Sequence, residues 1–367
     1  MIPVNEPLIG EREKEYVLDC LETGWISSAG KYVDQFEAKW AEYCGMQFGV
    51  GVCNGTAALL AAVAALELKP GDEVIMPSFT IISCALAIVE SGATPVLVDS
   101  DPEIWTMDVR QVAEKITPRT RAIMPVHIYG HPVDMDPLWG LAEQHNLIIL
   151  EDAAEAHGAE YRGRKCGSLG NMSCFSFYAN KIITTGEGGM VLTSDPDLAG
   201  RLRDQRNLAF KPERRFYHTE LGHNYRLTNL QAAIGLAQIE RIEELITKKR
   251  RMAQLYEDGL SGLPLQLPVE KDWAKNVYWM YGVVLDDAVP FDVLEFAHRL
   301  KESGVGTRPF FLGMHEQPVL NDRNLFIGER YPVAERLARR GLYLPSGLTL
   351  TEGQIEQVVE AVRGILV

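Results

Sequence analysis

Short apolar runs alternate with helical stretches over the first two thirds of the chain, and this alternation limits the fold more than any other feature. The runs predicted as strands are 48–52, 73–77, 94–99, 122–127 and 147–152. Apolar strands that are separated by helices are typical of a parallel sheet covered on both faces. In such an α/β fold ligands bind at the carboxyl ends of the strands, so we expect the functional residues there.

The remaining third has a different pattern. From Leu230 onward the chain forms long helical stretches, followed by a mixture of strands and helices. A total of 367 residues is enough for two domains with sizeable cores. We therefore predict a large domain over 1–245 and a smaller C-terminal α+β domain over 246–367. The basic run at 246–254 is interpreted as a solvated helix face.

Charge and cysteine content exclude several classes of protein. The net charge is −14 and no long basic run occurs, which argues against a nucleic-acid partner. The six cysteines form no C-x-x-C pair and no zinc-like spacing with histidine, so we expect buried thiols in a reducing compartment and no metal site. The N-terminus has no apolar signal core, and no stretch is long enough to span a membrane. We therefore expect a cytoplasmic protein with no membrane partner.

Three segments with chemically useful side chains fall at predicted strand ends. The Asn-Gly-Thr turn at 54–56 opens a helix whose free amides favour an anion, although it can also be a plain helix cap. Asp152 ends an apolar strand, where a carboxylate needs a partner, a function or a helix to cap. Lys181 follows Ser176 in FSFYANKIITTGEGGM. Without a function, Lys181 would be an ordinary surface lysine whose aliphatic stem packs while its amine reaches water.

Together these segments fit one cofactor. Pyridoxal phosphate needs a lysine for its Schiff base, an acid beside its ring nitrogen and donors for its phosphate. Burial lowers the pKa of an amine and so makes it a better nucleophile. Burying a lysine in a close-packed turn costs free energy, and this cost is explained if the lysine is the reactive group.

Four longer strings carry a family resemblance. Their order resembles that of the sugar-nucleotide aminotransferases of the DegT/DnrJ/EryC1/StrS type. The strings are N-G-T, E-D-A-A-E-A-H-G-A, F-S-F-x-x-N-K-I-I-T-T-G-E-G-G-M and N-Y-R-L-T-N-L-Q-A-A-I-G-L-A-Q. The resemblance extends from near residue 24 to near residue 307. It implies the type I aspartate aminotransferase fold and pyridoxal 5'-phosphate, with pyridoxamine phosphate as intermediate. It also implies a homodimer with shared active sites.

Shorter strings narrow the resemblance. P-V-H-I-Y-G, I-T-T-G-E-G-G-M and N-Y-R-L-T-N look most like the GDP-perosamine synthases. That similarity implies a transfer of the amino group of L-glutamate to C4 of GDP-4-keto-6-deoxymannose. The same chemistry on a dTDP- or UDP-linked keto sugar is the nearest alternative.

The resemblance also implies roles for single residues. Lys181 corresponds to the Schiff-base lysine that moves the proton, and Asp152 corresponds to the partner of the ring nitrogen. Asn224 corresponds to a residue that reaches the phosphate of the neighbouring subunit's cofactor. The remaining implied cofactor contacts are Gly55, Thr56, Ala57, Ile81, Glu155 and Ser176. The implied substrate contacts are Trp25, Ser28, Lys31, Arg308, Phe310 and His315.

Two of these positions depart from the family pattern. Many relatives carry glutamine at the position of Glu155, which contacts the ring hydroxyl. A carboxylate there repels an oxyanion unless one of the two groups is protonated. Ile81 stands where an aromatic residue usually stacks on the cofactor ring. An aliphatic side chain still covers the ring by packing but makes no π contact.

Three further classes of protein are less favoured. Sugar dehydratases of the same family carry histidine at the position of Lys181. An NAD-dependent sugar oxidoreductase needs a G-x-G-x-x-G fingerprint, and the glycines near residue 50 have the wrong spacing. A catalytically inactive regulatory homologue has no reason to keep both Lys181 and Asp152.

Overall fold

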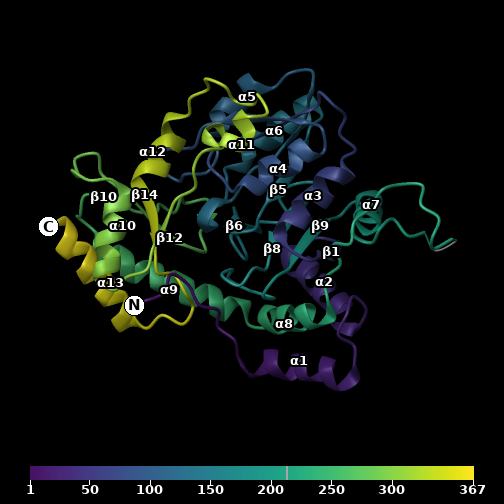
Figure 1. Cartoon of the computed structure of the whole chain (residues 1–367), viewed down its shortest axis with the longest axis horizontal. Coiled ribbons are helices and arrows are strands. Elements are labelled where there is room, and N and C mark those ends of the chain that lie inside the picture. The colour runs from purple at the N-terminus through teal and green to yellow at the C-terminus, as the bar shows by residue number, and fades with distance from the viewer. Residues whose placement is uncertain (212–213) are drawn as a thin grey trace.

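The computed structural model describes residues 1–211 and 214–367. Within them, the strands of the first two thirds form a seven-stranded sheet, which lies near the centre of Figure 1. Its strands, in spatial order, are β1 (Phe48–Val52), β9 (Gly189–Thr193), β8 (Met172–Ser176), β5 (Ile148–Asp152), β4 (Thr120–Ile123), β2 (Glu73–Pro77) and β3 (Thr94–Val98). The expected α/β fold with a mainly parallel sheet is confirmed.

Strand β9 is the antiparallel member of this sheet. It pairs antiparallel with both β8 and β1, whereas β8, β5, β4, β2 and β3 pair in parallel. The chain passes from β8 to β9 through a turn and not through a helix. A return to a parallel strand usually runs through a crossover helix, and residues 177–188, which connect β8 to β9, form none.

Strand β4 is shorter than the sequence pattern predicts. The prediction extended over 122–127, but β4 ends at Ile123. Pro125 has no backbone N–H and cannot continue the ladder. Val126 then forms only an isolated bridge with Asp152.

Helices cover both faces of the large sheet, because every residue of β2 and β9 is buried although neighbouring side chains point to opposite faces. Helix α3 packs on β8 and β9, and α6 packs on β4 and β5. The helices of this part are α1 (Glu11–Thr23), α2 (Lys31–Cys44), α3 (Gly55–Ala65), α4 (Ile82–Glu90), η1 (Val109–Gln111), α5 (Val112–Lys115), η2 (Ile128–Gly130), α6 (Met135–His145), α7 (Pro196–Arg206) and α8 (Asn229–Ile239).

The C-terminal part contains a four-stranded sheet in the order β10 (Leu265–Gln266), β12 (Tyr281–Leu285), β14 (Gly341–Leu344) and β13 (Arg308–Pro309). Its helices are α9 (Ile242–Leu260), α10 (Val293–Glu302), η3 (Met314–Glu316), α11 (Pro318–Asn321), α12 (Pro332–Arg340) and α13 (Glu352–Leu366). A small sheet of β11 (Ala274–Lys275), β6 (Glu160–Tyr161) and β7 (Arg164–Lys165) connects the two parts.

Helix α9 joins two hydrophobic cores. Ile246 packs in the larger core, and Met252, less than two turns later, packs in the smaller one. Two segments cross the expected boundary, because Ile2 packs in the smaller core and Phe310 in the larger one. The division into 1–245 and 246–367 stays a prediction.

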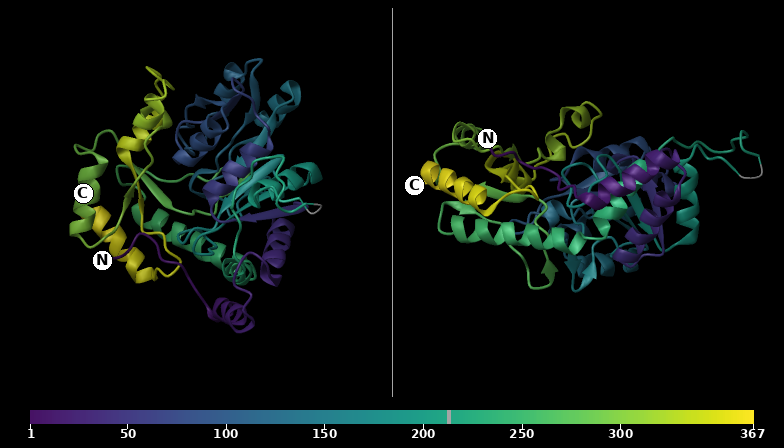
Figure 2. Two further views of the ribbon diagram at one scale, coloured as in Figure 1. Left: turned by 45° about the vertical axis from the view of Figure 1, so that its right-hand side comes forward. Right: turned by 90° about the horizontal axis from the view of Figure 1, so that it is seen from below.

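Described residues on either side of 212–213, between α7 and α8, extend away from the body of the molecule (Figure 2). Phe216 and Leu221 on this segment are exposed to 81% and 89%. Both chain termini lie at the opposite end, beside the smaller sheet (Figure 1). Across the described residues, no helix combines the length and the apolar character needed to cross a membrane.

Candidate active site

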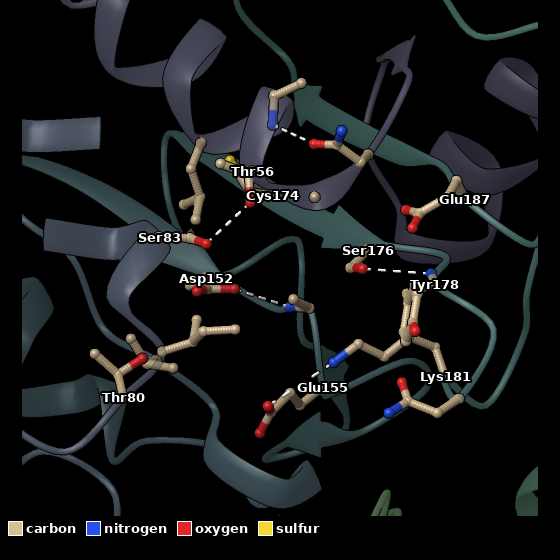
Figure 3. Close-up of a pocket in the computed structure, with 18 of the residues that line it drawn as sticks. Thr56, Thr80, Ser83, Asp152, Glu155, Cys174, Ser176, Tyr178, Lys181 and Glu187 are labelled. Carbon is tan, nitrogen blue, oxygen red and sulfur yellow. Dashed lines mark hydrogen bonds and ion pairs between the residues drawn. The ribbon is translucent and has the colours of Figure 1, made fainter. Parts of the chain in front are cut away.

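A cavity of about 590 Å³ opens at the carboxyl edge of the large sheet. Its volume lies within the range of roughly 300–1,000 Å³ that is usual for small-molecule sites. The ends of β1, β5 and β8 and the start of α4 supply side chains to it, and so does the smaller sheet. Figure 3 shows Lys181, Glu155, Asp152 and Ser176 around the same space.

The start of α3 forms a polar cradle at one end of the cavity. The Asn54 side chain accepts from the Ala57 amide at 2.8 Å, while the first amides of a helix have no partner within the helix. A Cβ atom on Gly55 would lie 2.7 Å from Cβ of Ser176, so only glycine leaves the cradle open. The Thr56 hydroxyl lies 2.9 Å from that of Ser83. This end offers hydroxyls, free amides and a helix N-terminus to an anion.

Asp152 ends β5 with its carboxylate facing the cavity, although the residue as a whole is buried. The Cys84 thiol donates to Oδ2 at 3.0 Å, and the Ala154 amide donates to Oδ1 at 3.1 Å. These bonds hold the carboxylate in place without neutralising it. A fixed buried carboxylate stabilises a positively charged partner strongly.

The side chain of Lys181 is mostly buried, with 10% exposure. Its Nζ lies 3.8 Å from Oε1 of Glu155 and 3.5 Å from the ring centre of Trp279. Burial lowers the pKa of the Lys181 amine, and the carboxylates of Glu155 and Asp152 oppose this shift. Burial also raises the pKa of the Glu155 carboxyl, whose Oε2 accepts from the Tyr129 amide at 2.7 Å. The amine is thus closer to its neutral, nucleophilic form than an exposed lysine is.

Glu155→Gln is expected to move the pH dependence of the Lys181 amine. The ionised Glu155 carboxylate favours the ammonium form, so its removal lowers the pKa of Lys181 further. The half-maximal rate at which the protein captures pyridoxal phosphate, the cofactor that the sequence resemblance implies, should shift to lower pH by about one unit. Stopped-flow absorbance over a pH series measures this midpoint. Glu187→Gln removes another carboxylate of the same cavity and is the control; equal midpoints in wild type and Glu155→Gln would contradict the assignment.

The structure brings most of the predicted cofactor residues together around the cavity. They are Gly55, Thr56, Ala57, Ile81, Asp152, Glu155, Ser176 and Lys181. Asn224 is exposed and does not line the cavity of its own chain. Trp25 and Lys31 line a separate pocket of about 390 Å³ beside α1, and Ser28 lies in the exposed loop between them.

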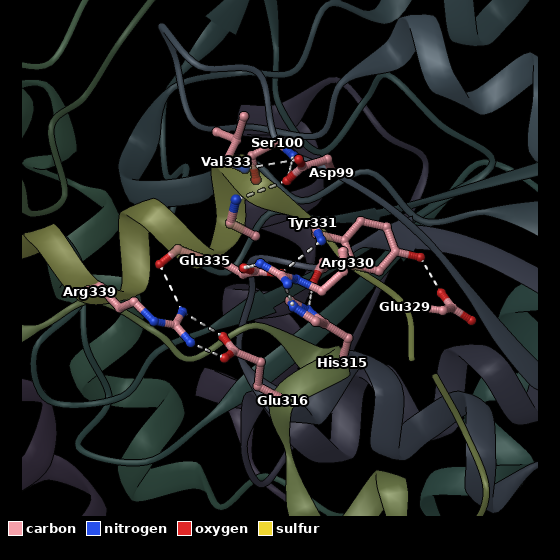
Figure 4. Close-up of polar contacts among 12 residues, drawn as sticks. Asp99, Ser100, His315, Glu316, Glu329, Arg330, Tyr331, Val333, Glu335 and Arg339 are labelled. Atoms are coloured by element: carbon pink, nitrogen blue, oxygen red, sulfur yellow. Dashed lines mark hydrogen bonds and ion pairs between the residues drawn. The ribbon is translucent and has the colours of Figure 1, made fainter. Parts of the chain in front are cut away.

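The other three predicted substrate residues do not line the cavity either. His315 is buried, with Nδ1 2.8 Å from Oγ of Ser78 and Nε2 3.3 Å from Oε1 of Glu335 (Figure 4). Phe310 packs in the larger core, and Arg308 is exposed on β13. The substrate roles of all six residues stay predictions.

Several cavity residues are absent from the sequence prediction. They include Tyr178, Asn180, Trp279, Phe311 and Tyr343. Tyr178 and Asn180 lie inside the lysine string, and Phe311 is the second phenylalanine of R-P-F-F, so these strings could have indicated them. Trp279 and Tyr343 come from the smaller sheet, and no local pattern marks them.

The remaining charged side chains give no sign of a metal centre. In the parts of the chain that the structure describes, no three His, Cys, Asp or Glu side chains gather in a way that could hold a metal ion.

Comparisons with known proteins agree over nearly the whole chain. Residues 7–363 match the DegT/DnrJ/EryC1/StrS aminotransferase family. The GDP-perosamine synthase of Caulobacter vibrioides is 44% identical over 368 residues, which cover 100% of this chain and 98% of that protein. The GDP-perosamine synthase of Escherichia coli O157:H7 is 42% identical over 362 residues, with 99% and 98% covered.

A solved structure gives the same result for the fold. The aminotransferase TlmJ from Streptoalloteichus hindustanus superposes with a TM-score of 0.92 at 33% identity, and the match covers 100% of this chain and 99% of that chain. The expected type I aspartate aminotransferase fold is confirmed. The chain belongs to the DegT/DnrJ/EryC1/StrS aminotransferase family and is a pyridoxal-phosphate-dependent sugar aminotransferase.

Proposed function

We propose that the enzyme transfers the amino group of L-glutamate to C4 of GDP-4-keto-6-deoxymannose, giving GDP-perosamine. The observation that carries this proposal is the similarity to GDP-perosamine synthases over almost the full length of both chains. The strings P-V-H-I-Y-G and N-Y-R-L-T-N favour the same group. The preserved amine and carboxylate in the cavity favour an active enzyme over an inactive homologue.

The cavity fits pyridoxal phosphate at three points. The cradle of Gly55, Thr56 and Ser176 is open where a Cβ would close it, and it suits the phosphate. Asp152 offers a fixed carboxylate to the ring nitrogen. Lys181 offers a buried amine with a lowered pKa. When bound, this cofactor supplies the electron sink that a transamination requires.

The residues of this chain then have separate tasks. Asp152 holds a proton on the ring nitrogen by placing a negative charge beside it. The Lys181 amine would accept a proton from the carbon that carries the transferred nitrogen and would deliver it to the carbon on the other side of that nitrogen, as a general base and then a general acid. Glu155 is fixed by the Tyr129 amide and faces Lys181, so it controls the charge of that amine. Ile81 covers the site by packing alone.

Absorbance spectroscopy tests the proposed reaction in two steps. A visible band that shifts when L-glutamate is added identifies the cofactor and the amino donor. GDP-, dTDP- and UDP-linked 4-keto-6-deoxy sugars are then offered separately to the aminated enzyme. Return of the original band with the GDP-linked sugar supports the proposal, and return only with a dTDP- or UDP-linked sugar overturns its substrate. A protein without the band after incubation with the cofactor favours the inactive homologue.

We infer further that the enzyme is a homodimer whose subunits complete each other's sites. Asn224 lies in the segment between α7 and α8, is exposed, and does not line the cavity of its own chain. Exposed apolar side chains on that segment, such as Phe216 and Leu221, suit contact with a second subunit.

All six cysteines are free, which supports a reducing compartment such as the cytoplasm.

A complementation experiment tests the shared site. Lys181→Ala and Asn224→Ala are each expected to be impaired, because each site of such a dimer lacks one group. After subunit exchange, about a quarter of wild-type turnover should return, since about half of the dimers are mixed and each mixed dimer has one complete site. Turnover at limiting cofactor measures the recovery. A mixture that shows only the sum of the two separate activities contradicts the shared site.

A further inference from the structure

Lys249 on α9 is buried with 1% exposure, although it lies in the basic run that the sequence pattern assigns to a solvated helix face. The prediction is wrong at this position, because α9 crosses between the two hydrophobic cores and its central turn is enclosed by both. Ile246, one turn earlier, packs in the larger core, and Met252 packs in the smaller one. A cation at this point needs partners.

The partners of Lys249 are two backbone carbonyls from the smaller sheet. Its Nζ donates to the carbonyl of Trp279 at 2.8 Å and to the carbonyl of Ser346. Among residues 1–211 and 214–367, no carboxylate forms an ion pair with it. Burial lowers the pKa of Lys249 to about 7. A neutral amine still carries two N–H groups, so both carbonyls keep their donor in either charge state.

The two carbonyls lie at matching points of neighbouring strands. Trp279 precedes β12 by two residues, and Ser346 follows β14 by two residues. The strands are joined there, since Tyr281 pairs with Leu344. Lys249 therefore clamps the end of this strand pair to α9, which continues into the larger core.

The clamped residue Trp279 reaches the catalytic lysine. Its ring centre lies 3.5 Å from Nζ of Lys181, and its indole N–H donates to the carbonyl of Asn180, the residue before that lysine, at 2.8 Å. Trp279 has 4% exposure and lines the cavity. One tryptophan thus contacts both the side chain of Lys181 and the turn that carries it.

We propose that Lys249 is a positioning residue for the reaction: it fixes the backbone of Trp279 so that the indole ring orients the Lys181 amine. The smaller sheet is thereby coupled to the reactive group through a single buried side chain. The inference rests on the proposed role of Lys181.

Capture of pyridoxal phosphate by the apoenzyme tests this inference without any sugar or amino donor. Lys249→Met keeps an unbranched side chain that is one heavy atom shorter, and it removes the N–H donors. We expect the plateau rate of band formation at high pH to fall about tenfold, because a misplaced reactive group loses its near-attack geometry. We also expect the half-maximal pH to fall by about half a unit, because the ring no longer stabilises the ammonium form. Glu155 and Asp152, the carboxylates that act on Lys181, are unchanged in every variant.

Tyr256→Phe is the matched control. Tyr256 also lies on α9, and its hydroxyl donates to the carbonyl of Pro345 at 2.8 Å, next to Ser346. Its loss removes a similar buried hydrogen bond but no contact with Trp279. The control should lower the unfolding temperature and leave both the plateau rate and the midpoint at their wild-type values.

A double-mutant cycle with Trp279→Phe separates positioning from general loosening. If Lys249 acts through Trp279, the double variant is no slower than the slower single variant; if the two slowing factors multiply, the proposal is overturned. Lys249→Gln is measured in parallel, and it serves as the test variant in the case that Lys249→Met does not fold. A rate between those of wild type and Trp279→Phe supports the proposal, and the wild-type rate overturns it. A wild-type protein that forms no band refutes the role of Lys181 itself, which is a distinct failure.

Discussion

Lys181→Ala is expected to reduce transaminase turnover by about 10⁴-fold or more, because it removes both the covalent attachment and the proton carrier. The purified variant should also lack the visible band of the cofactor-loaded enzyme. Folding should be retained, since Glu155 can take up a proton once its buried cation is gone. Steady-state turnover, absorbance and thermal unfolding measure these three results.

Two controls sharpen this experiment. Lys181→Arg keeps a cation beside Glu155 but has no reactive amine, so it should be equally inactive. A small primary amine added in solution should restore part of the turnover of Lys181→Ala, because it can carry the missing proton and fits the space that the side chain leaves. Wild-type turnover in Lys181→Ala would refute the assignment of the reactive group.

Asp152→Asn has the second largest expected effect. The amide has nearly the same shape and can still accept from the Ala154 amide, but it carries no charge for the ring nitrogen. Removing one fixed electrostatic group from a buried site typically costs about 10²–10³-fold in kcat. We expect a loss of this size, with cofactor still bound. Single-turnover kinetics with glutamate measure the loss in the first half-reaction.

Asp99→Asn is the matched control for Asp152→Asn. Asp99 is also a buried carboxylate that accepts backbone amides, but its partners are Val333 and Ala334 at the start of α12 (Figure 4). Its loss should reduce stability by about 1 kcal/mol, as for other helix caps, and leave kcat unchanged. Equal kcat in wild type and Asp152→Asn would rule out a role for the Asp152 charge in the reaction.

The part of the site that could be predicted lies in three short segments. The turn at 54–56 follows β1, Asp152 is the last residue of β5, and Lys181 follows β8. Since the carboxyl ends of parallel strands meet at one edge, the strand pattern alone places these groups together. The lysine string then identifies the chemistry, because its residues are consecutive and specific.

The part that could not be predicted depends on contacts between distant segments. Trp279, just before β12 of the smaller sheet, reaches Lys181 from about a hundred residues away along the chain. His315 contacts Ser78 and Glu335, from two distant parts of the chain, and its predicted substrate role stays a prediction. No local pattern reports which residues a loop meets after the two parts have packed.

The sequence by itself determined the α/β class, the strand ends that carry the anion cradle, and the lysine and aspartate of the site. These features follow from hydrophobic periodicity and from strings of neighbouring residues, which are local properties. Only the tertiary structure decided that Lys249 is buried and that Trp279 covers Lys181. The burial of a helical residue depends on what packs around the helix from elsewhere in the chain. The charges of the run at 246–254 therefore do not indicate which of its residues is buried.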